Sequence, residues 1–100
     1  MANEDRIIAV YMTANRKNGA IYTGVTSSLV QRTWRHQEGT AAGFTKTHGC
    51  KTLIWYAVHE WIEAAIALER SLKSYRRQNK INLITANNPD WSDLWFEITG

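Results

Sequence analysis

The fold is decided by residues 6–25, in which Arg6-Ile-Ile-Ala-Val-Tyr-Met12 and Ala20-Ile-Tyr-Thr-Gly-Val25 flank the segment Asn15-Arg-Lys-Asn-Gly19. The two flanking segments are rich in residues that favour β-strands, and the middle segment ends in Asn-Gly, a pair that favours tight hairpin turns. This pattern predicts a β-hairpin of two antiparallel strands.

A helix is expected directly after the hairpin. The residues Ser28-Leu-Val-Gln31 have the form of a capping box, in which the serine side chain bonds the Gln31 amide and the glutamine reaches back. Gly39 is expected to end this helix. Residues 40–50 show no clear period, and we expect a loop or one short helical turn there.

The second half of the chain predicts a third strand and further helices. Residues 51–59, Lys-Thr-Leu-Ile-Trp-Tyr-Ala-Val-His, form a continuous apolar run of strand length, which is typical of a central strand buried on both faces. Residues 61–78 are rich in helix formers and contain neither Gly nor Pro, so we expect one long helix there. After Pro89, Asp90 could cap a short terminal helix that runs through Trp95.

Composition limits the class of protein. The 100 residues are 44% hydrophobic with a formal charge of +3, which suits one domain over residues 1–100 and is compatible with a polyanionic partner. Cys50 is the single cysteine and cannot close an internal disulfide, which favours a reducing compartment. The first residues lack the pattern of a secretory signal, and no apolar run approaches the ~20 residues of a membrane-spanning helix. We therefore expect a soluble, cytoplasmic protein.

Glu69 is unusual in its surroundings. Along the expected long helix the apolar positions form one face that runs from Trp61 to Tyr75, and Glu69 falls inside this face. One explanation is an ion pair with Lys73, four residues later, which would add about 0.2–0.5 kcal/mol. The other is a metal ligand, because Mg²⁺ needs only one or two protein carboxylates besides water and substrate phosphate oxygens. The spacing alone leaves both explanations open.

Two pairs of side chains could carry chemistry. Arg32 and His36 are four residues apart on the first expected helix, so they project from one face. A guanidinium suits phosphate oxygens and an imidazole can move a proton near neutral pH, although a solvated basic face that includes Arg35 would also explain the pair. Tyr11 and Tyr22 lie on the two strands of the hairpin. They are either packing residues or phenols that orient a nucleophilic water or a phosphate oxygen.

Basic residues gather towards the end of the expected long helix, and the chain has five tryptophans with flat apolar faces. A basic patch with aromatic residues is a loose signal for nucleic-acid binding, although core packing explains most of the tryptophans. The candidate nucleic-acid contacts are Arg35, Lys46, Arg70, Lys73, Arg76, Arg77 and Lys80.

Taken together, these features resemble a known family. Ala9-Val-Tyr11, Tyr22-Thr-Gly24, Leu29-x-x-Arg32-x-x-x-His36, and Glu69 within a long helix agree in order and spacing with the GIY-YIG nuclease superfamily. The chain particularly resembles small single-domain bacterial members, and it is similar to the N-terminal domain of the excision-repair nuclease subunit and to GIY-YIG homing endonuclease catalytic domains. The stretches that carry this likeness are Tyr22-Thr-Gly-Val-Thr-Ser-Ser-Leu, Gly43-Phe-Thr-Lys and Leu83-Ile-Thr-Ala-Asn-Asn-Pro-Asp-Trp-Ser-Asp-Leu94. The motif positions that depart from the family pattern are Ala9, Val10 and Thr23.

The resemblance implies an α+β fold in which a three-stranded antiparallel sheet is flanked by helices. It implies hydrolysis of phosphodiester bonds in nucleic acid, with DNA as the expected substrate, and one divalent ion, Mg²⁺ or Mn²⁺, held by Glu69. The two motif tyrosines, the phosphate-binding arginine, the histidine on the same helix and the asparagine near the site would be Tyr11, Tyr22, Arg32, His36 and Asn88. Two other classes of function stay open: a non-catalytic nucleic-acid-binding module of the same fold, and a protein-interaction domain.

Overall fold

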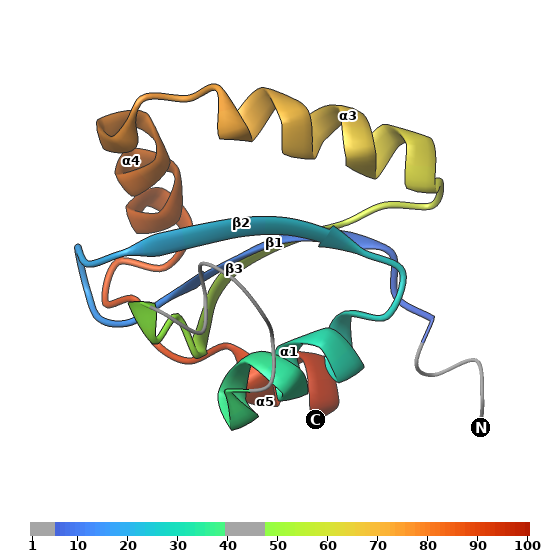
Figure 1. The fold of residues 1–100 in the computed structure, drawn as a ribbon, viewed down its shortest axis with the longest axis horizontal. Helices are drawn as coiled ribbons and strands as arrows, with labels where there is room; N and C mark the ends of the chain where they lie inside the picture. Colours follow the sequence, from blue (N-terminus) through green and yellow to red (C-terminus); the bar gives the residue numbers. More distant parts are fainter. Residues whose placement is uncertain (1–5, 40–47) are drawn as a thin grey trace.

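The structure is a computed structural model that describes residues 6–39 and 48–100. Along these residues the strands are β1 (Ala9–Ala14), β2 (Ile21–Thr26) and β3 (Thr52–Val58). The helices are α1 (Leu29–Glu38), α3 (Ile62–Lys73), α4 (Arg77–Asn87) and α5 (Trp95–Thr99). The expected α+β fold, a three-stranded antiparallel sheet flanked by helices, is confirmed (Figure 1).

The sheet has the order β2-β1-β3, and both pairs of neighbouring strands are antiparallel. β1 is therefore the central strand, and all of its residues are buried. The expectation that residues 51–59 form the central strand was wrong: β3 is an edge strand, and Val58 at its end is 60% exposed. The apolar run in β3 arises because helices cover both faces of the sheet. Burial of both faces does not distinguish a central strand from an edge strand, so the run could not show that β3 lies at the edge.

The predicted hairpin is confirmed, and its turn is closed by Asn15. The Asn15 N–H donates to the Ala20 carbonyl at 3.3 Å, and the Ala20 N–H donates to Asn15 Oδ1 at 2.8 Å. A Cβ at Gly19 would lie 2.1 Å from Asn15 Oδ1, so this arrangement requires glycine there. Asn18 has φ 58°, a left-handed conformation that asparagine tolerates better than most residues.

Helix α1 begins without the expected capping box. The Ser28 side chain makes no capping hydrogen bond. Other groups bond the N–H groups at the start of the helix. The Ser28 N–H donates to Thr26 Oγ1 at 2.9 Å, and the Leu29 N–H donates to the Ile7 carbonyl at 3.1 Å. The chain just before β1 therefore fixes where the helix starts. The predicted end at Gly39 is confirmed, since this residue has φ 74° and closes the helix in the left-handed region.

The expected single helix over residues 61–78 is divided in two. Helix α3 ends at Lys73, and α4 begins at Arg77 after a corner. The Ser74 hydroxyl donates to the Ser71 carbonyl at 2.7 Å, which offers the backbone an alternative to the next helical hydrogen bond. The buried part of the apolar face is also shorter than expected. Ala65 and Leu72 are buried, whereas Trp61 and Tyr75 at the two ends of the face are 69% and 41% exposed.

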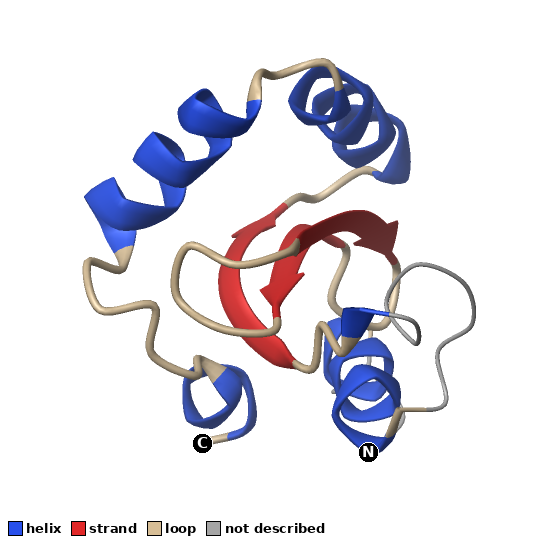
Figure 2. Ribbon diagram, turned by 60° about the vertical axis from the view of Figure 1, so that its left-hand side comes forward, coloured by secondary structure: helices blue, strands red, loops and turns tan. Residues whose placement is uncertain are grey.

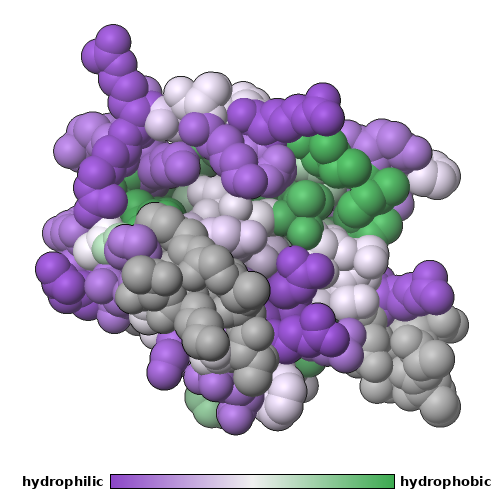
Figure 3. Space-filling view, viewed as in Figure 1, coloured by the Kyte–Doolittle hydropathy of each residue, from purple (hydrophilic) through white to green (hydrophobic). Residues whose placement is uncertain are grey.

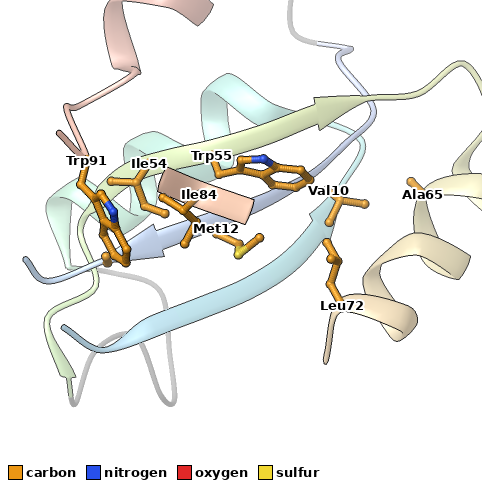
Figure 4. Close-up of a cluster of buried hydrophobic side chains, with 9 residues drawn as sticks. Val10, Met12, Ile54, Trp55, Ala65, Leu72, Ile84 and Trp91 are labelled. Carbon is orange, nitrogen blue, oxygen red and sulfur yellow. The ribbon is translucent and has the colours of Figure 1, made fainter. Parts of the chain in front are cut away.

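Helices cover both faces of the sheet. In Figure 1, α3 and α4 lie above the sheet and α1 and α5 below it, and Figure 2 shows the twisted sheet in the middle of these helices. The upper core contains Val10, Met12, Ile54 and Trp55 from the strands (Figure 4). The core on the other face contains Ala9, Tyr11, Leu29 and Leu53. This division assigns Tyr11 to the face that packs against α1.

The C-terminal region also differs from expectation, because Asp90 caps no helix. Residues 88–92 form a turn in which the Trp91 N–H donates to the Asn88 carbonyl at 3.0 Å. Trp91 has φ 54°, a strained conformation for a large residue, and its burial in the upper core stabilises it (Figure 4). Helix α5 starts at Trp95, where the expected helix would have ended. No helix in the described part of the chain is long and apolar enough to cross a membrane.

Candidate active site

Strands β1 and β2 and helix α1 bring together four of the expected site residues. Tyr11 is paired with Gly24 and Tyr22 with Thr13, so the two tyrosines are diagonal neighbours across the hairpin. Their ring centroids are 6.1 Å apart. The His36 ring, from α1, lies 5.4 Å from the Tyr11 ring and 5.3 Å from the Tyr22 ring.

Tyr11 is the centre of this group. Its phenol oxygen is 3.0 Å from His36 Nε2, and this hydrogen bond is buried. The Arg32 side chain also hydrogen-bonds to the Tyr11 phenol, and so does the Tyr22 side chain. The half-buried Arg32 guanidinium therefore points at the phenols, as the spacing on α1 predicted. We call Tyr11, Tyr22, Arg32 and His36 the tyrosine cluster.

Tyr11 is held in its protonated form. Burial raises the pKa of its phenol well above the ordinary value, and the charge of Tyr22 raises it further, while the hydrogen bond and charge of Arg32 act in the opposite direction. Burial disfavours the charged form of a phenol, so Tyr11 keeps its proton.

His36 is held in its neutral form. Burial lowers the pKa of its imidazole to about 4, and the nearby Arg32 guanidinium contributes in the same direction. A neutral imidazole has one nitrogen that donates and one that accepts. The Tyr11 O–H donates to Nε2 if the ring proton is on Nδ1, and Nε2–H donates to the phenol oxygen in the other tautomer.

Gly24 makes room for both phenols. A Cβ at this position would lie 2.7 Å from the Tyr11 hydroxyl oxygen and 2.9 Å from the Tyr22 ring. This role depends on the register that places Gly24 opposite Tyr11, which local pattern does not specify. A glycine two residues after a tyrosine in a strand is the sequence signal that could have indicated it, since residues two apart share a face.

Glu69 lies on α3, between the buried residues Ala65 and Leu72 on the same face of the helix. Its side chain is only 12% exposed, and its Oε2 is 2.6 Å from Lys73 Nζ. The ion pair that the spacing allowed is therefore formed. Lys73 in turn interacts electrostatically with Tyr22, so it links Glu69 to the tyrosine cluster.

The donor set around Glu69 suits a hard divalent cation that keeps most of its waters. Mg²⁺ and Mn²⁺ prefer oxygen ligands, and the Glu69 carboxylate supplies them. Residues 6–39 and 48–100 contain no group of three or more His, Cys, Asp or Glu side chains that could hold a metal. An ion here would consequently depend on Glu69, on water and on oxygen atoms of a bound substrate.

Asn88 does not join the tyrosine cluster. Its side-chain N–H₂ donates to the Ile54 carbonyl at 3.0 Å and to the Ser92 carbonyl at 2.9 Å, and its Oδ1 accepts from the Ser92 N–H at 3.1 Å. These bonds fasten the turn at residues 88–92 to β3, whereas Tyr22 lies on β2 at the opposite edge of the sheet. These bonds give Asn88 a structural task in this fold, and its expected role in the site stays a prediction.

The expected nucleic-acid contacts gather at the corner between α3 and α4. Arg70 and Lys73 lie at the end of α3, and Arg76, Arg77 and Lys80 lie at the start of α4. This upper left part of the molecule is largely hydrophilic (Figure 3). Arg35 is exposed on α1, apart from this corner, and Lys46 lies outside the described residues.

Arg77 has a structural task at this corner. Its guanidinium donates to the Asn18 carbonyl at 2.7 Å and to the Gly19 carbonyl at 2.6 Å. It thereby attaches the hairpin turn to the start of α4. Two hollows of about 460 and 440 Å³ lie elsewhere, against β3 and between α1 and α5, and the tyrosine cluster lines neither of them.

Comparisons with known proteins agree with this geometry. The chain is 31% identical over 67 residues to the UPF0213 protein of Staphylococcus aureus strain Mu3, and this match covers 67% of the chain and 82% of the relative. The UPF0213 proteins of S. aureus strains N315 and MW2 match with the same identity and the same coverage. No solved structure matches the chain.

The family model of the GIY-YIG catalytic domain matches residues 7–82. This range includes both tyrosines, all of α1 and α3, and Glu69. Because the match spans well over half of the sequence, the chain belongs to the GIY-YIG catalytic domain family.

Proposed function

We propose that this protein is a divalent-metal-dependent endonuclease that hydrolyses phosphodiester bonds in nucleic acid, with DNA as the expected substrate. The tyrosine cluster in a GIY-YIG chain is the observation that carries this proposal. Phosphodiester hydrolysis requires a positioned water, neutralisation of charge at phosphorus and help for the leaving oxygen. The residues of the site divide among these tasks.

Arg32 is the residue proposed to bind the scissile phosphate. A guanidinium presents its donors in a rigid fork that matches phosphate oxygens, and Arg32 carries this fork to the two phenols. Because His36 stays neutral near pH 7, Arg32 is the positive charge of the cluster. The phosphate would therefore meet one fixed cation beside two hydroxyl groups.

Tyr22 is the phenol proposed to orient and deprotonate the attacking water. Tyr11 is fully buried, is bonded to His36 and has a raised pKa, so it is poorly placed to accept a proton. Tyr22 is half-buried on the edge strand β2, and the Lys73 ammonium lies near it. Tyr22 is therefore the more accessible of the two phenols.

Glu69 is proposed to hold one Mg²⁺ or Mn²⁺ ion. A bound divalent ion supplies positive charge to a phosphate oxygen and to the leaving oxygen. Glu69 is a suitable ligand because its carboxylate is largely buried on the face of α3 that also carries Ala65 and Leu72. Lys73, which is bonded to Glu69, also interacts electrostatically with Tyr22 on the edge strand β2, and this supports assigning the carboxylate to the same site as the tyrosine cluster.

The test is cleavage of labelled duplex, single-stranded and branched DNA, and of the matching RNAs, with Mg²⁺ and with Mn²⁺. Glu69→Gln keeps the shape of the side chain and removes its charge, so it should abolish cleavage. Glu63→Gln, at an exposed position of the same helix, is the matched control and should cleave as the wild type does. Substrate binding without cleavage by the wild type would instead identify a non-catalytic binding module.

A further inference from the structure

The Glu69 carboxylate requires a positive charge even when no metal is bound. The Glu69 side chain is only 12% exposed, and it shares a helical face with buried apolar residues. An ionised carboxylate in such surroundings is costly unless a cation compensates it. In this structure the compensating group is the ammonium of Lys73, 2.6 Å from Oε2.

Lys73 can leave that position easily. Its side chain is 55% exposed, so its ammonium regains water as soon as the contact with Glu69 opens. Lysine is a flexible chain that ends in a strongly hydrated point charge, which suits a reversible contact better than the rigid fork of arginine would. Lys80 on α4 is close enough for its charge to repel that of Lys73.

The ammonium and a divalent ion cannot share one carboxylate oxygen comfortably. Mg²⁺ sits about 2.0–2.1 Å from a ligand oxygen, so an ion on Oε2 would lie within about 5 Å of the Lys73 nitrogen. Like charges at that separation repel, most strongly where the surroundings are poor in water. The arrival of the metal therefore favours the departure of the lysine.

We propose that Lys73 is the internal counter-ion of Glu69 in the metal-free protein and that a divalent ion binds by displacing it. This inference rests on the proposed role of Glu69 as the metal ligand. It makes Lys73 a positioning residue, which pairs with the carboxylate and orients it between catalytic cycles. It also means that the protein binds metal more weakly than the Glu69 site alone would.

The experiment is a Mn²⁺ titration of the isolated protein at constant ionic strength, followed by electron paramagnetic resonance of the unbound ion. Lys73→Met removes the competitor and should tighten Mn²⁺ binding about three- to tenfold. Lys73→Gln should show the same gain, because it also lacks the charge but can still hydrogen-bond to the carboxylate. Arg70→Met removes a neighbouring exposed cation from the same helix and should change the affinity far less.

Melting temperatures give a second measurement. Without metal, Lys73→Met should melt below the wild type, and saturating Mn²⁺ should raise its melting temperature more than that of the wild type. Unchanged or weaker Mn²⁺ binding in both Lys73 variants would overturn the proposal, and so would an equal gain in Arg70→Met. Glu69→Gln separates the two hypotheses: if it still binds Mn²⁺ as the wild type does, the assigned metal ligand itself is wrong.

Discussion

Gly24 lies directly opposite Tyr11 in the β1–β2 ladder, and the Tyr11 phenol occupies the space that a side chain at position 24 would need. The Tyr11 oxygen would be 2.7 Å from a Cβ on Gly24. The phenol cannot easily move away, since it is completely buried and is bonded to His36 and Arg32. The glycine of the second family motif is thus explained by the tyrosine of the first.

The first prediction concerns this contact. Gly24→Ala should destabilise the protein by about 1–3 kcal/mol, because an added methyl group in a packed interior forces its neighbours to shift. It should also reduce cleavage by displacing the phenols. Urea unfolding and cleavage assays measure the two effects. Combined with Tyr11→Phe, which removes the nearest atom, the two losses of stability should be less than additive, and a purely additive double variant would contradict the steric explanation.

The second prediction separates the two phenols. Tyr22→Phe should lower the cleavage rate about 10²–10³-fold, because loss of a general base costs rates of this order, and it should cost less stability than Tyr11→Phe because Tyr22 is only half-buried. Tyr11→Phe should instead lower stability by about 1–3 kcal/mol, since it leaves buried hydrogen-bonding groups without their partner. Single-turnover cleavage and urea unfolding of both variants check this. A Tyr22→Phe variant with wild-type rates would remove Tyr22 from the mechanism.

The third prediction follows from the neutral His36. Its folded-state pKa of about 4 lies below the ordinary value of 6.5, so between these pH values the unfolded chain binds more protons than the folded protein. The contribution of His36 to the free energy of unfolding should therefore be complete above about pH 6.5. As the pH falls towards 4, the free energy of unfolding should decrease by on the order of 2 kcal/mol. Urea unfolding from pH 4.5 to 7.5 measures the slope.

His36→Gln is the control for this pH dependence. The glutamine amide can still bond to Tyr11 but does not titrate in this range. Its unfolding free energy should be nearly independent of pH over the same window. An equal slope in His36→Gln and in the wild type would show that other groups cause the loss of stability in acid.

The sequence predicted the parts of the fold that depend on local pattern. The hairpin was recognisable from two β-rich segments around Asn-Gly, and Gly39 ended α1 as expected. The proximity of Arg32 and His36 to the tyrosines also followed from the periods of helix and strand. These features need only residues that are close in the sequence, so pattern was sufficient for them.

The errors lie where distant contacts decide. A straight continuation of α3 would carry Ile84 roughly 18 Å beyond Leu72, whereas both residues pack in one core, so the chain must turn between them. The Arg77 contact with the hairpin turn spans 59 residues and fixes that corner. Two further hydrogen bonds join residues that are far apart in the sequence. The Asn88 side chain donates to the Ile54 carbonyl of β3, and the Leu29 N–H at the start of α1 donates to the Ile7 carbonyl. No local pattern encodes either bond.

The fourth prediction tests the structural task of Arg77. Arg77→Ala removes hydrogen bonds from a charged donor to the Asn18 and Gly19 carbonyls and should cost about 1–2 kcal/mol of stability. Arg76→Ala, at the exposed neighbouring position, should leave stability within about 0.5 kcal/mol of the wild type. Urea unfolding compares the two variants. If Arg77→Ala is as stable as Arg76→Ala, the contact with the hairpin turn contributes nothing.

The last prediction concerns how the protein chooses its substrate. A protein reads sequence by presenting several side chains to base edges, whereas contacts with phosphates position without specifying. Here α1 turns its inner face, with His36, towards the sheet, and α3 buries Ala65 and Leu72 on the face that carries Glu69. Each helix thus commits one face to the site or the core, which leaves little surface for base readout. We therefore expect cleavage with little sequence preference and recognition through the nucleic-acid backbone.

Binding should then depend steeply on salt, through the basic corner between α3 and α4. Removing one phosphate contact from duplex DNA should flatten the plot of log affinity against log salt by about 0.9. Arg70→Gln, Arg76→Gln and Lys80→Gln should each approach this change, whereas Arg77→Gln should change it less because its guanidinium is bonded to the hairpin turn. Cleavage of a randomised duplex, with sequencing of the ends, completes the test, since a defined recognition sequence of several base pairs would show that this surface reads bases after all.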